Sequence, residues 1–474
     1  MMAAMRSAVR RLFGAIQHFK FDRVAVVVML VFVAGAGVRL WYMAQWRPAF
    51  LGYGDSAAYV SAAVGGFDYD TSRPGGYALF LRLGHAISAQ LSYTIALQHL
   101  LGIATAALLY LAVRRATGSR WLGLMPAAVV LFDGFQVTLE HSPMSEALFT
   151  FLVAGALYGA VRSLDGGWAW PAMAGVLAAA SGLVKSTGLL VMAFLIVCIL
   201  AWRRDEWRRR LASAGLAGAA AVGVLAVFVA GVALLGKERD SPTISPASGR
   251  TLYSRVGPFA DCREFEPPAR TRVLCERPSP AREQRGTNYY LHDENNPARR
   301  AFGFAGEEDG LVRSFAIAAI AGQPLDYLSA VGKDLEHFAR PAGAPSAAVE
   351  LADGSQFLPL LLARGSNYYE DISSFSSPNP EPLMGYATTV LVDGWLMFLF
   401  LVMPLASLLV TRGTERHCVA IFAGTGWLLI LASAATTNYD PRYAAVALPA
   451  LAAGTAPALR AAAHAAGRFR AGWH

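Results

Sequence analysis

The chain has 474 residues, of which 55% are hydrophobic and only 16% are charged. Soluble globular proteins carry about 25% charged residues, so this composition excludes an ordinary soluble enzyme and indicates a surface that faces lipid. It also excludes a disordered chain, which would need many charges and few apolar residues. The net charge of +8 is compatible with a nucleic-acid partner only if membrane topology does not explain the positions of the basic residues.

Apolar stretches recur along the chain, each bounded by charged residues or Gly/Pro-rich loops. About 20 helical residues cross a bilayer, and the stretches that we predict to do so are 24–43, 92–113, 121–139, 145–163, 170–184, 187–202, 212–235, 387–411, 417–436 and 442–459. The first follows basic residues, as a secretory signal does, but it is longer than the apolar core of a signal, so we interpret it as an uncleaved span. The sequence predicts an all-α polytopic membrane protein with about ten transmembrane helices.

Basic residues set the expected orientation. With the N-terminus inside, the cytoplasmic segments contain 19 of the 41 Lys and Arg residues, and the short outer loops 139–145 and 436–441 contain none. These cytoplasmic segments are 1–23, 114–120, 162–168, 203–210, 412–416 and 460–474. The positive-inside rule therefore predicts that both termini are cytoplasmic. It also explains the basic charge without nucleic acid.

The long polar stretch 236–386 divides the chain. We predict a first membrane module, 1–235, whose first outer loop is 44–91, then an extracytoplasmic, loop-rich region, 236–386, and finally C-terminal transmembrane helices with a cytoplasmic tail, 387–474. Cys262 and Cys275 lie in the extracytoplasmic region, where oxidising conditions favour a disulfide between them. Two free thiols are the alternative.

Lys185 lies in the middle of the 33-residue apolar stretch from Trp170 to Trp202. This stretch is too long for one span and too short for two full ones, and an ammonium at mid-bilayer would cost about 2.5–3.5 kcal/mol. Two short helices that turn at Lys185 near the outer surface avoid that cost. In the alternative interpretation, Lys185 extends its side chain to the lipid headgroups.

Ionisable residues gather where the predicted spans reach the outer surface. The acids are Asp55, Asp68, Asp70, Asp133, Glu140, Glu146, Asp393 and Asp440, and the basic residues are Arg73, Arg82, Lys185 and Arg442. Ionisable groups at membrane depth are retained mainly for function or for pairing. The sequence therefore predicts a polar site at the outer interface.

Four motifs on this side resemble a known enzyme superfamily. They are Asp55-Ser56 with Tyr59, followed by Arg73-Pro74-Gly75-Gly76-Tyr77; Pro143-Met144-Ser145-Glu146; Ser181-Gly182-Leu183-Val184-Lys185-Ser186-Thr187-Gly188; and Tyr439-Asp440-Pro441-Arg442-Tyr443. Their order resembles the C-type (GT-C) glycosyltransferases that depend on polyprenyl-phosphate sugars, which include protein O-mannosyltransferases and lipid A aminoarabinose transferases. Protein O-mannosyltransferases usually carry paired acids in the first loop, whereas Asp55 is followed by Ser56. The resemblance therefore favours the bacterial branch.

The resemblance implies a GT-C-like helical bundle in the bacterial inner membrane, with an extracytoplasmic active site. Such an enzyme, a hexosyl- or pentosyltransferase, would move a sugar from a polyprenyl-phosphate donor to an acceptor hydroxyl, with inversion. The acceptor stays open among an envelope glycan, a lipid and a protein. This chemistry needs a base for the acceptor proton and cations for the departing phosphate. We predict Asp55 as the general base and Arg73, Lys185 and Arg442 as the phosphate ligands.

Structural interpretations compete with these roles. Asp55 could cap a helix that starts beside the membrane. Arg73 and Arg442 could pair with Asp70 and Asp440 to neutralise a buried interface.

Five residues are expected to orient the acceptor: Tyr59, Glu140, His141, Glu146 and Tyr443. His141 with its neighbouring acids could instead hold a divalent cation. A metal is not favoured, because no second histidine lies close in the sequence and Glu146 could be a helix N-terminal charge favoured by the dipole. We expect no required cofactor.

Two rival functions differ in class. A transporter or flippase for lipid-linked sugars would also need cations for phosphate, but it should show repeats or broken helices across two halves, and the seven-plus-three arrangement of spans lacks that symmetry. A non-catalytic subunit of an envelope assembly is the other.

Overall fold

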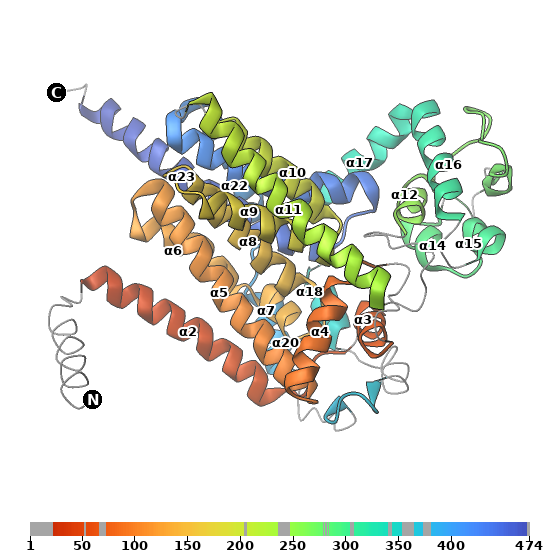
Figure 1. The fold of residues 1–474 in the computed structure, drawn as a ribbon, viewed down its shortest axis with the longest axis horizontal. Coiled ribbons are helices and arrows are strands. Elements are labelled where there is room, and N and C mark those ends of the chain that lie inside the picture. The colour runs from red at the N-terminus through yellow and green to blue at the C-terminus, as the bar shows by residue number, and fades with distance from the viewer. Residues whose placement is uncertain are drawn as a thin grey trace.

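The computed structural model describes residues 22–51, 54–65, 73–202, 206–235, 247–277, 279, 282, 284–303, 308–339, 344–352, 365–372 and 381–471. Its elements are helices, and most of them form one bundle with a smaller helical group beside it (Figure 1). The expected all-α class is confirmed.

The bundle contains most of the predicted apolar stretches as helices. These are α2 (Arg23–Gln45), α5 (Leu91–Thr117), α6 (Arg120–Phe132), α7 (Gly134–Glu140), α8 (Glu146–Ser163), α9 (Ala169–Val184), α10 (Thr187–Leu200), α11 (Trp207–Leu235), α20 (Glu381–Thr389), α21 (Gly394–Val410), α22 (Gly413–Thr436) and α23 (Pro441–Ala471). Five helices among the described residues are long and apolar enough to cross a membrane. Two pairs of helices, α6 with α7 and α20 with α21, are each bent at a short break, and counting each pair as one span makes seven. Ten spans stay a prediction.

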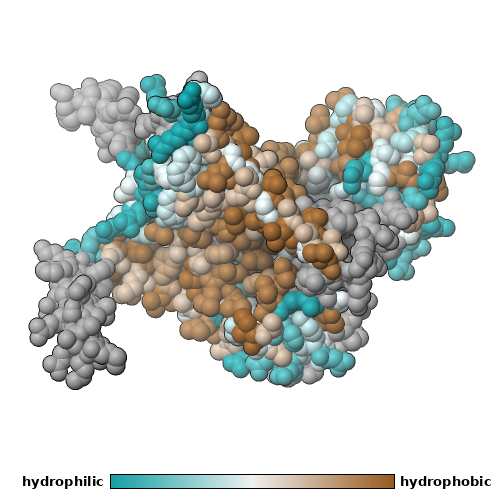
Figure 2. Space-filling view, viewed as in Figure 1, coloured by the Kyte–Doolittle hydropathy of each residue, from teal (hydrophilic) through white to brown (hydrophobic). Residues whose placement is uncertain are grey.

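Apolar side chains cover the outside of the bundle between its polar ends (Figure 2). Leu40 on α2, Val227 on α11 and Leu409 on α21 are all more than two-thirds exposed. In water each would be unfavourable, whereas lipid tails solvate them. The surface therefore fits a multi-pass membrane protein.

Asp133 explains both bent pairs. Its carboxylate accepts hydrogen bonds from the backbone N–H of Gln136 at 2.9 Å, where α7 begins, and from that of Val392 at 2.8 Å, between α20 and α21. The helix axes change direction by 58° from α6 to α7 and by 41° from α20 to α21. The predicted span 121–139 is therefore broken, because a buried carboxylate binds the backbone that each break releases.

The turn at Lys185 is confirmed. Helix α9 ends at Val184, Lys185 has an extended backbone, and α10 begins at Thr187. Gly188 makes the tight turn possible, because a Cβ there would lie 2.5 Å from the backbone nitrogen of Gly182. Two short helices thus replace one long span.

Two short helices lie within the predicted first outer loop, 44–91, at this end of the bundle: α3 (Gly54–Val64) and α4 (Gly76–Ile87). Helix α4 starts against the end of α9, where a Cβ on Gly76 would meet the carbonyl oxygen of Leu183 at 2.5 Å. The close approach fixes the start of α4 against the turn at Lys185.

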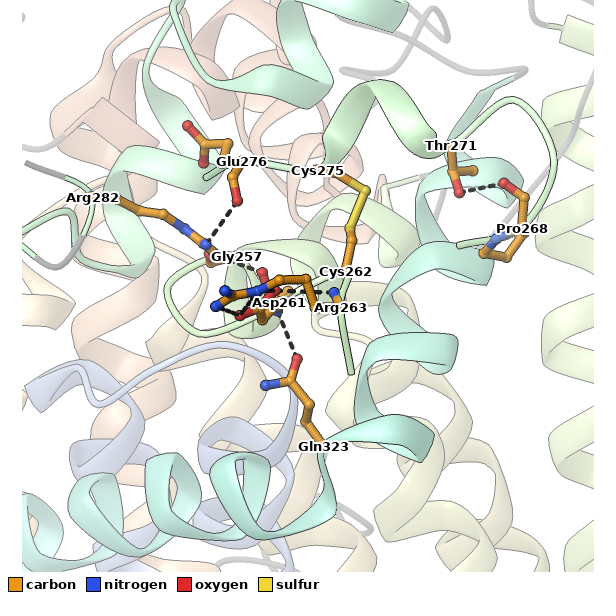
Figure 3. Close-up of a disulfide and its surroundings, with 11 residues drawn as sticks. Gly257, Asp261, Cys262, Arg263, Pro268, Thr271, Cys275, Glu276, Arg282 and Gln323 are labelled. Atoms are coloured by element: carbon orange, nitrogen blue, oxygen red, sulfur yellow. Dashed lines mark hydrogen bonds and ion pairs between the residues drawn. A yellow bond between two sulfur atoms is a disulfide. The ribbon is translucent and has the colours of Figure 1, made fainter. Parts of the chain in front are cut away.

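The polar region forms its own helical group, seen at the right of Figure 1. It contains α12 (Ser248–Val256), η1 (Arg272–Leu274), α14 (Thr287–His292), α15 (Pro297–Phe302), α16 (Asp309–Gly322) and α17 (Pro324–Ala339). Helix α18 (Ala344–Ala352) follows in the chain but packs against the bundle, where Ala347 and Ala348 share an apolar core with Phe135 of α7. Tyr253, Phe315 and Tyr290 lie at the centre of a separate apolar core. The predicted disulfide between Cys262 and Cys275 is present (Figure 3).

Contacts near the C-terminal end of α22 hold this group to the bundle. Arg255 on α12 pairs with Asp334 on α17 at 2.6 Å and donates to the carbonyl of Thr437 at 3.2 Å. Tyr327 on α17 donates to the carbonyl of Ala435 at 3.0 Å. The polar region is therefore anchored a few residues before Asp440.

Candidate functional site

Asp55 lies in the first turn of α3, and two arginines from distant parts of the chain bind its carboxylate. Arg73, from the loop before α4, contacts Oδ1 through Nη2 and through Nε at 3.1 Å. Arg442, at the start of α23, places Nη1 2.5 Å from Oδ2. The side chain of Asp55 is 22% exposed. Among the described residues, the side-chain oxygens of Asp55 therefore contact cations rather than the free N–H groups of a helix end.

Arg442 is held on both sides. Asp440 precedes α23 and accepts a hydrogen bond from the backbone N–H of Arg442 at 2.8 Å, and its Oδ2 lies 2.7 Å from Nη2 of the same arginine. The expected pairing with Asp440 is therefore present, together with the contact to Asp55. The other expected partner, Asp70 for Arg73, lies outside the described residues, as does Asp68.

Glu146 and Lys185 form the next pair. Glu146 starts α8, Lys185 follows α9, and their Oε1 and Nζ atoms are 2.8 Å apart. Nη1 of Arg442 lies 4.0 Å from the same Oε1. The other carboxylate oxygen of Glu146 is buried and has no hydrogen-bond partner among the described residues. It is a buried acceptor that a bound hydroxyl could satisfy.

Two predicted tyrosines flank these charges. Tyr59 donates from its hydroxyl to Oγ of Ser145 at 3.0 Å, and the guanidinium of Arg73 lies 5.7 Å from its ring centre. The ring of Tyr443 lies 5.4 Å from Nζ of Lys185. Both distances are within the range of cation–π attraction. The rings therefore help to position the cations.

We call Asp55, Arg73, Glu146, Lys185, Asp440 and Arg442 the outer charge cluster. It has three acids and three cations, so a phosphate can enter only by taking over cations that now bind carboxylates. Burial would raise the pKa of Asp55, but the guanidiniums of Arg73 and Arg442 outweigh burial and hold that pKa well below its usual range. Asp55 is therefore ionised and, in this arrangement, weakly basic.

Burial lowers the pKa of the His292 imidazole on α14, and the charges of Asp55, Arg73 and Arg442 also act on that pKa. His292 is one of two histidines in the polar region 236–386, and no sequence signal linked it to the predicted first outer loop.

Glu140 and His141 lie outside the outer charge cluster, although the sequence analysis grouped them with Glu146. The carboxylate of Glu140 accepts hydrogen bonds from Nε and Nη2 of Arg39 at 2.8 and 2.7 Å. Nδ1 of His99 lies 3.1 Å from the same carboxylate. His141 contacts His99 at 3.0 Å and the carbonyl of Trp46 at 3.2 Å. All are fully buried.

The reason is the change of chain direction between α7 and α8. Glu140 ends α7 and points among α2 and α5, whereas Glu146 begins α8 and faces Lys185. We call Arg39, His99, Glu140 and His141 the Glu140 network. Its signal in the sequence was Arg39, the one charged residue of the first apolar stretch, 24–43.

A second histidine, His99, does lie beside His141, although the two are far apart in the sequence. Even so, within the part of the chain that the structure describes, no group of three or more His, Cys, Asp or Glu residues could hold a metal ion.

Comparison with known proteins supports the resemblance seen in the motifs. Residues 91–235 match the model of the dolichyl-phosphate-mannose-protein mannosyltransferase family, which confirms over this segment the resemblance to GT-C glycosyltransferases. The segment contains Glu146 and Lys185, together with the Glu140 network except for Arg39. No curated protein matches the chain.

Archaeal oligosaccharyltransferases are among the solved structures to which the chain is similar. Oligosaccharyltransferase AglB from Archaeoglobus fulgidus, in complex with an inhibitory peptide and a dolichol-phosphate, has 14% sequence identity and a TM-score of 0.46, over 94% of this chain and 51% of that one. The apo form of the Archaeoglobus fulgidus oligosaccharyltransferase has 14% identity and a TM-score of 0.47, over 96% and 52%. This chain spans about half the length of these structures.

Proposed function

We propose that the protein is a membrane glycosyltransferase that moves a sugar from a polyprenyl-phosphate donor to an acceptor hydroxyl at the extracytoplasmic face of the bacterial inner membrane. The observation that carries the proposal is the outer charge cluster. Asp55, Lys185 and Arg442 come from three distant parts of the chain, and the fold gathers them at one end of an apolar bundle. A carboxylate together with several cations is what sugar transfer from a lipid phosphate requires.

The matched family adds independent support for the donor. Its description names a dolichyl-phosphate-linked sugar and a protein acceptor. Residues 91–235 supply Glu146 and Lys185, so the matched segment contributes one acid and one cation to the cluster. We extend the lipid-phosphate donor to this chain and leave the acceptor as a glycan, a lipid or a protein of the cell envelope.

The order of the charges suggests where each partner binds. Arg73 and Arg442 contact Asp55, whereas Lys185 contacts Glu146, and no ion pair joins Lys185 to Asp55 among the described residues. Inversion requires the base and the leaving group on opposite sides of the anomeric carbon. We therefore assign the departing phosphate to the Lys185 end and the acceptor hydroxyl to the Asp55 end.

Donor binding would also activate the base. With two guanidiniums on its oxygens, Asp55 attracts a proton weakly. Arg442 lies between Asp55 and Glu146, and a phosphate that draws this arginine away removes a cation from Asp55 and raises its pKa. The enzyme would then gain a stronger base only when the donor is bound, which limits wasteful hydrolysis.

Glu146 and the tyrosines would orient the substrates. The unpartnered oxygen of Glu146 can accept a hydrogen bond from a sugar hydroxyl. A site built to bind a hydroxyl discriminates strongly against substrates that lack that group. Tyr59 and Tyr443 would contribute by holding Arg73 and Lys185 in place.

The test is transfer by the purified protein in nanodiscs, with a panel of undecaprenyl-phosphate sugars and envelope acceptors. Asp55→Asn should reduce turnover by about 10²- to 10⁴-fold, the usual effect of removing a general base. Asp261→Asn is the matched control, because Asp261 pairs with exposed Arg263 in the polar region. Near-normal turnover by Asp55→Asn would reject the base assignment. Movement of the donor across proteoliposomes without transfer would select the flippase instead.

A further inference from the structure

The short turn between the last two helices connects the polar region to the outer charge cluster. Residues 437–440 join α22 to α23, and we call them the α22–α23 link. The link ends at Asp440, whose carboxylate accepts a hydrogen bond from the backbone N–H of Arg442 at 2.8 Å and so caps α23. The position of the link therefore sets the position of Arg442, the cation from α23 that contacts Asp55.

Two helices of the polar region hold this link. Helix α17 lies beside the C-terminal end of α22, where the polar region meets the bundle (Figure 1). Arg255 on α12 donates from Nη1 to the carbonyl of Thr437 at 3.2 Å and to Oδ2 of Asp334 at 2.6 Å. Asp334 belongs to α17, and its carboxylate also accepts a hydrogen bond from the backbone N–H of Tyr439. The backbone of the link is therefore bonded to the polar region at both Thr437 and Tyr439.

The side chain of Tyr439 adds a second kind of contact. Its ring stacks on the imidazole of His337, with 5.6 Å between ring centres and 27° between the planes. It also meets the ring of Phe338 edge-on, with 4.9 Å between ring centres. Both partners lie at the end of α17. Because Tyr439 directly precedes Asp440, these contacts restrict the link one residue before the cap of α23.

Arg255 is an unfavourable residue if its only task is to join the polar region to the bundle. Its side chain is 4% exposed, and its Nε and Nη2 atoms are buried without a hydrogen-bond partner among the described residues. Buried donors without partners destabilise a protein, and apolar side chains often replace a buried ion pair without loss. The burial of this guanidinium therefore favours a specific task at the link.

We propose that Arg255 is a positioning residue, which holds the α22–α23 link so that Arg442 stays between Asp55 and Glu146. The inference rests on the proposed function and gives the polar region a task in the same reaction. Within the described part of the chain Arg255 forms an ion pair with Asp334 alone, so its effect on the outer charge cluster passes through the link.

The link can transmit this effect because Asp440 and Arg442 move together. The cap of α23 joins them, and so does the ion pair between their side chains at 2.7 Å. A link that shifts therefore draws Arg442 away from Asp55, which lies in a different helix.

Three substitutions separate this role from a general effect on folding. Arg255→Met removes the contact with the link from α12. Asp334→Asn weakens the same contacts from α17 and serves if the first variant does not fold. Arg282→Met is the matched control, because Arg282 is also a buried arginine of the polar region but donates to three backbone carbonyls of that region instead of to the link.

The first measurement is hydrogen–deuterium exchange of the full chain in nanodiscs, followed in the peptides that contain the link. Arg255→Met and Asp334→Asn should raise the exchange rate of the link amides on the order of tenfold, the change expected when one hydrogen bond to a charged group is lost. Arg282→Met should leave that rate unchanged. Wild-type exchange of the link in both Arg255→Met and Asp334→Asn would overturn the proposal.

The second measurement is turnover per folded molecule in a double-mutant cycle with Arg442→Ala. Arg255→Met alone should lower turnover by about 10²-fold, the effect of misplacing a group in the site by about 1 Å. Added to Arg442→Ala, it should cause no further loss, because the residue through which it acts is already absent. Equal losses in the two backgrounds would overturn the proposal, since Arg255 would then act independently of Arg442.

Failure of the proposed function gives a different result, because the wild type then transfers no sugar from any donor of the panel. In that case the exchange measurement still decides whether Arg255 holds the link.

Discussion

The Glu140 network offers the sharpest test of how the structure assigns roles. Arg39 is almost fully buried, and its guanidinium donates to both carboxylate oxygens of Glu140 and to the carbonyls of Gly35, Val130 and Leu131, at 2.7–3.0 Å. These bonds use all five N–H groups that an arginine has. Glu140 is the anion in this arrangement, so its loss would leave a buried charge with no counterion.

Glu140→Gln keeps the shape of the side chain and removes the negative charge. Breaking a buried ion pair by removing one partner costs about 3–5 kcal/mol, and we expect a loss of that size in the free energy of unfolding. The double variant Arg39→Met/Glu140→Leu should recover most of it, because apolar side chains of similar volume often replace a buried pair without loss. Titration with SDS in mixed micelles measures the unfolding.

Asp165→Asn is the matched control, since its partner Arg115 is 49% exposed and such pairs contribute at most about 1 kcal/mol. Turnover per folded molecule should stay near normal in Glu140→Gln, because this residue lies outside the outer charge cluster. The reasoning is refuted if Glu140→Gln unfolds within about 1 kcal/mol of the wild type, or if turnover disappears while stability does not change.

Three further predictions concern Asp55, the disulfide and Gly76. Because Arg73 and Arg442 hold the pKa of Asp55 below its unfolded value of about 3.9, their contribution to stability is complete above that pH and is lost as the pH falls below it. Acid unfolding of the wild type should therefore be steeper than that of Asp55→Asn, with no difference in slope between pH 5 and 8. Replacing Cys262 and Cys275 by serine should destabilise the polar region by about 3 kcal/mol, the value expected for a loop of this length, and limited proteolysis should then cut that region faster; equal cutting rates would count against it. Gly76→Ala should cost about 1–3 kcal/mol and slow transfer, because its Cβ would meet the backbone of Leu183 rather than a movable side chain; wild-type stability and turnover would show that α4 adjusts freely.

The arrangement of the outer charge cluster links the proposed catalytic site to folding of the whole chain. Asp55 lies near the N-terminus and Arg442 near the C-terminus, yet their side chains are 2.5 Å apart. The polar region between them is anchored at Thr437 through Arg255. The proposed base is therefore assembled only after α23 has packed into the bundle.

Much of the fold could be predicted from the sequence. Helix positions follow from long apolar stretches, because a bilayer requires every backbone N–H and C=O to be satisfied within the helix. The cost of burying an ammonium predicted the turn at Lys185, and the redox environment predicted the disulfide. The same reasoning placed Asp55, Glu146, Lys185 and Arg442 at one end of the bundle.

Only the tertiary structure decided which of these side chains meet. Glu140 and Glu146 are six residues apart, but the bend from α7 to α8 sends one to Arg39 and the other to Lys185. Asp133 also broke a span that the apolar pattern shows as continuous. Hydrophobic patterns indicate the depth of a residue in the membrane, because the free energy of transferring a given side chain into the bilayer depends on its depth. The partner of an ionisable group depends on how helices rotate and pack against each other, and that is set by contacts between residues far apart in the chain.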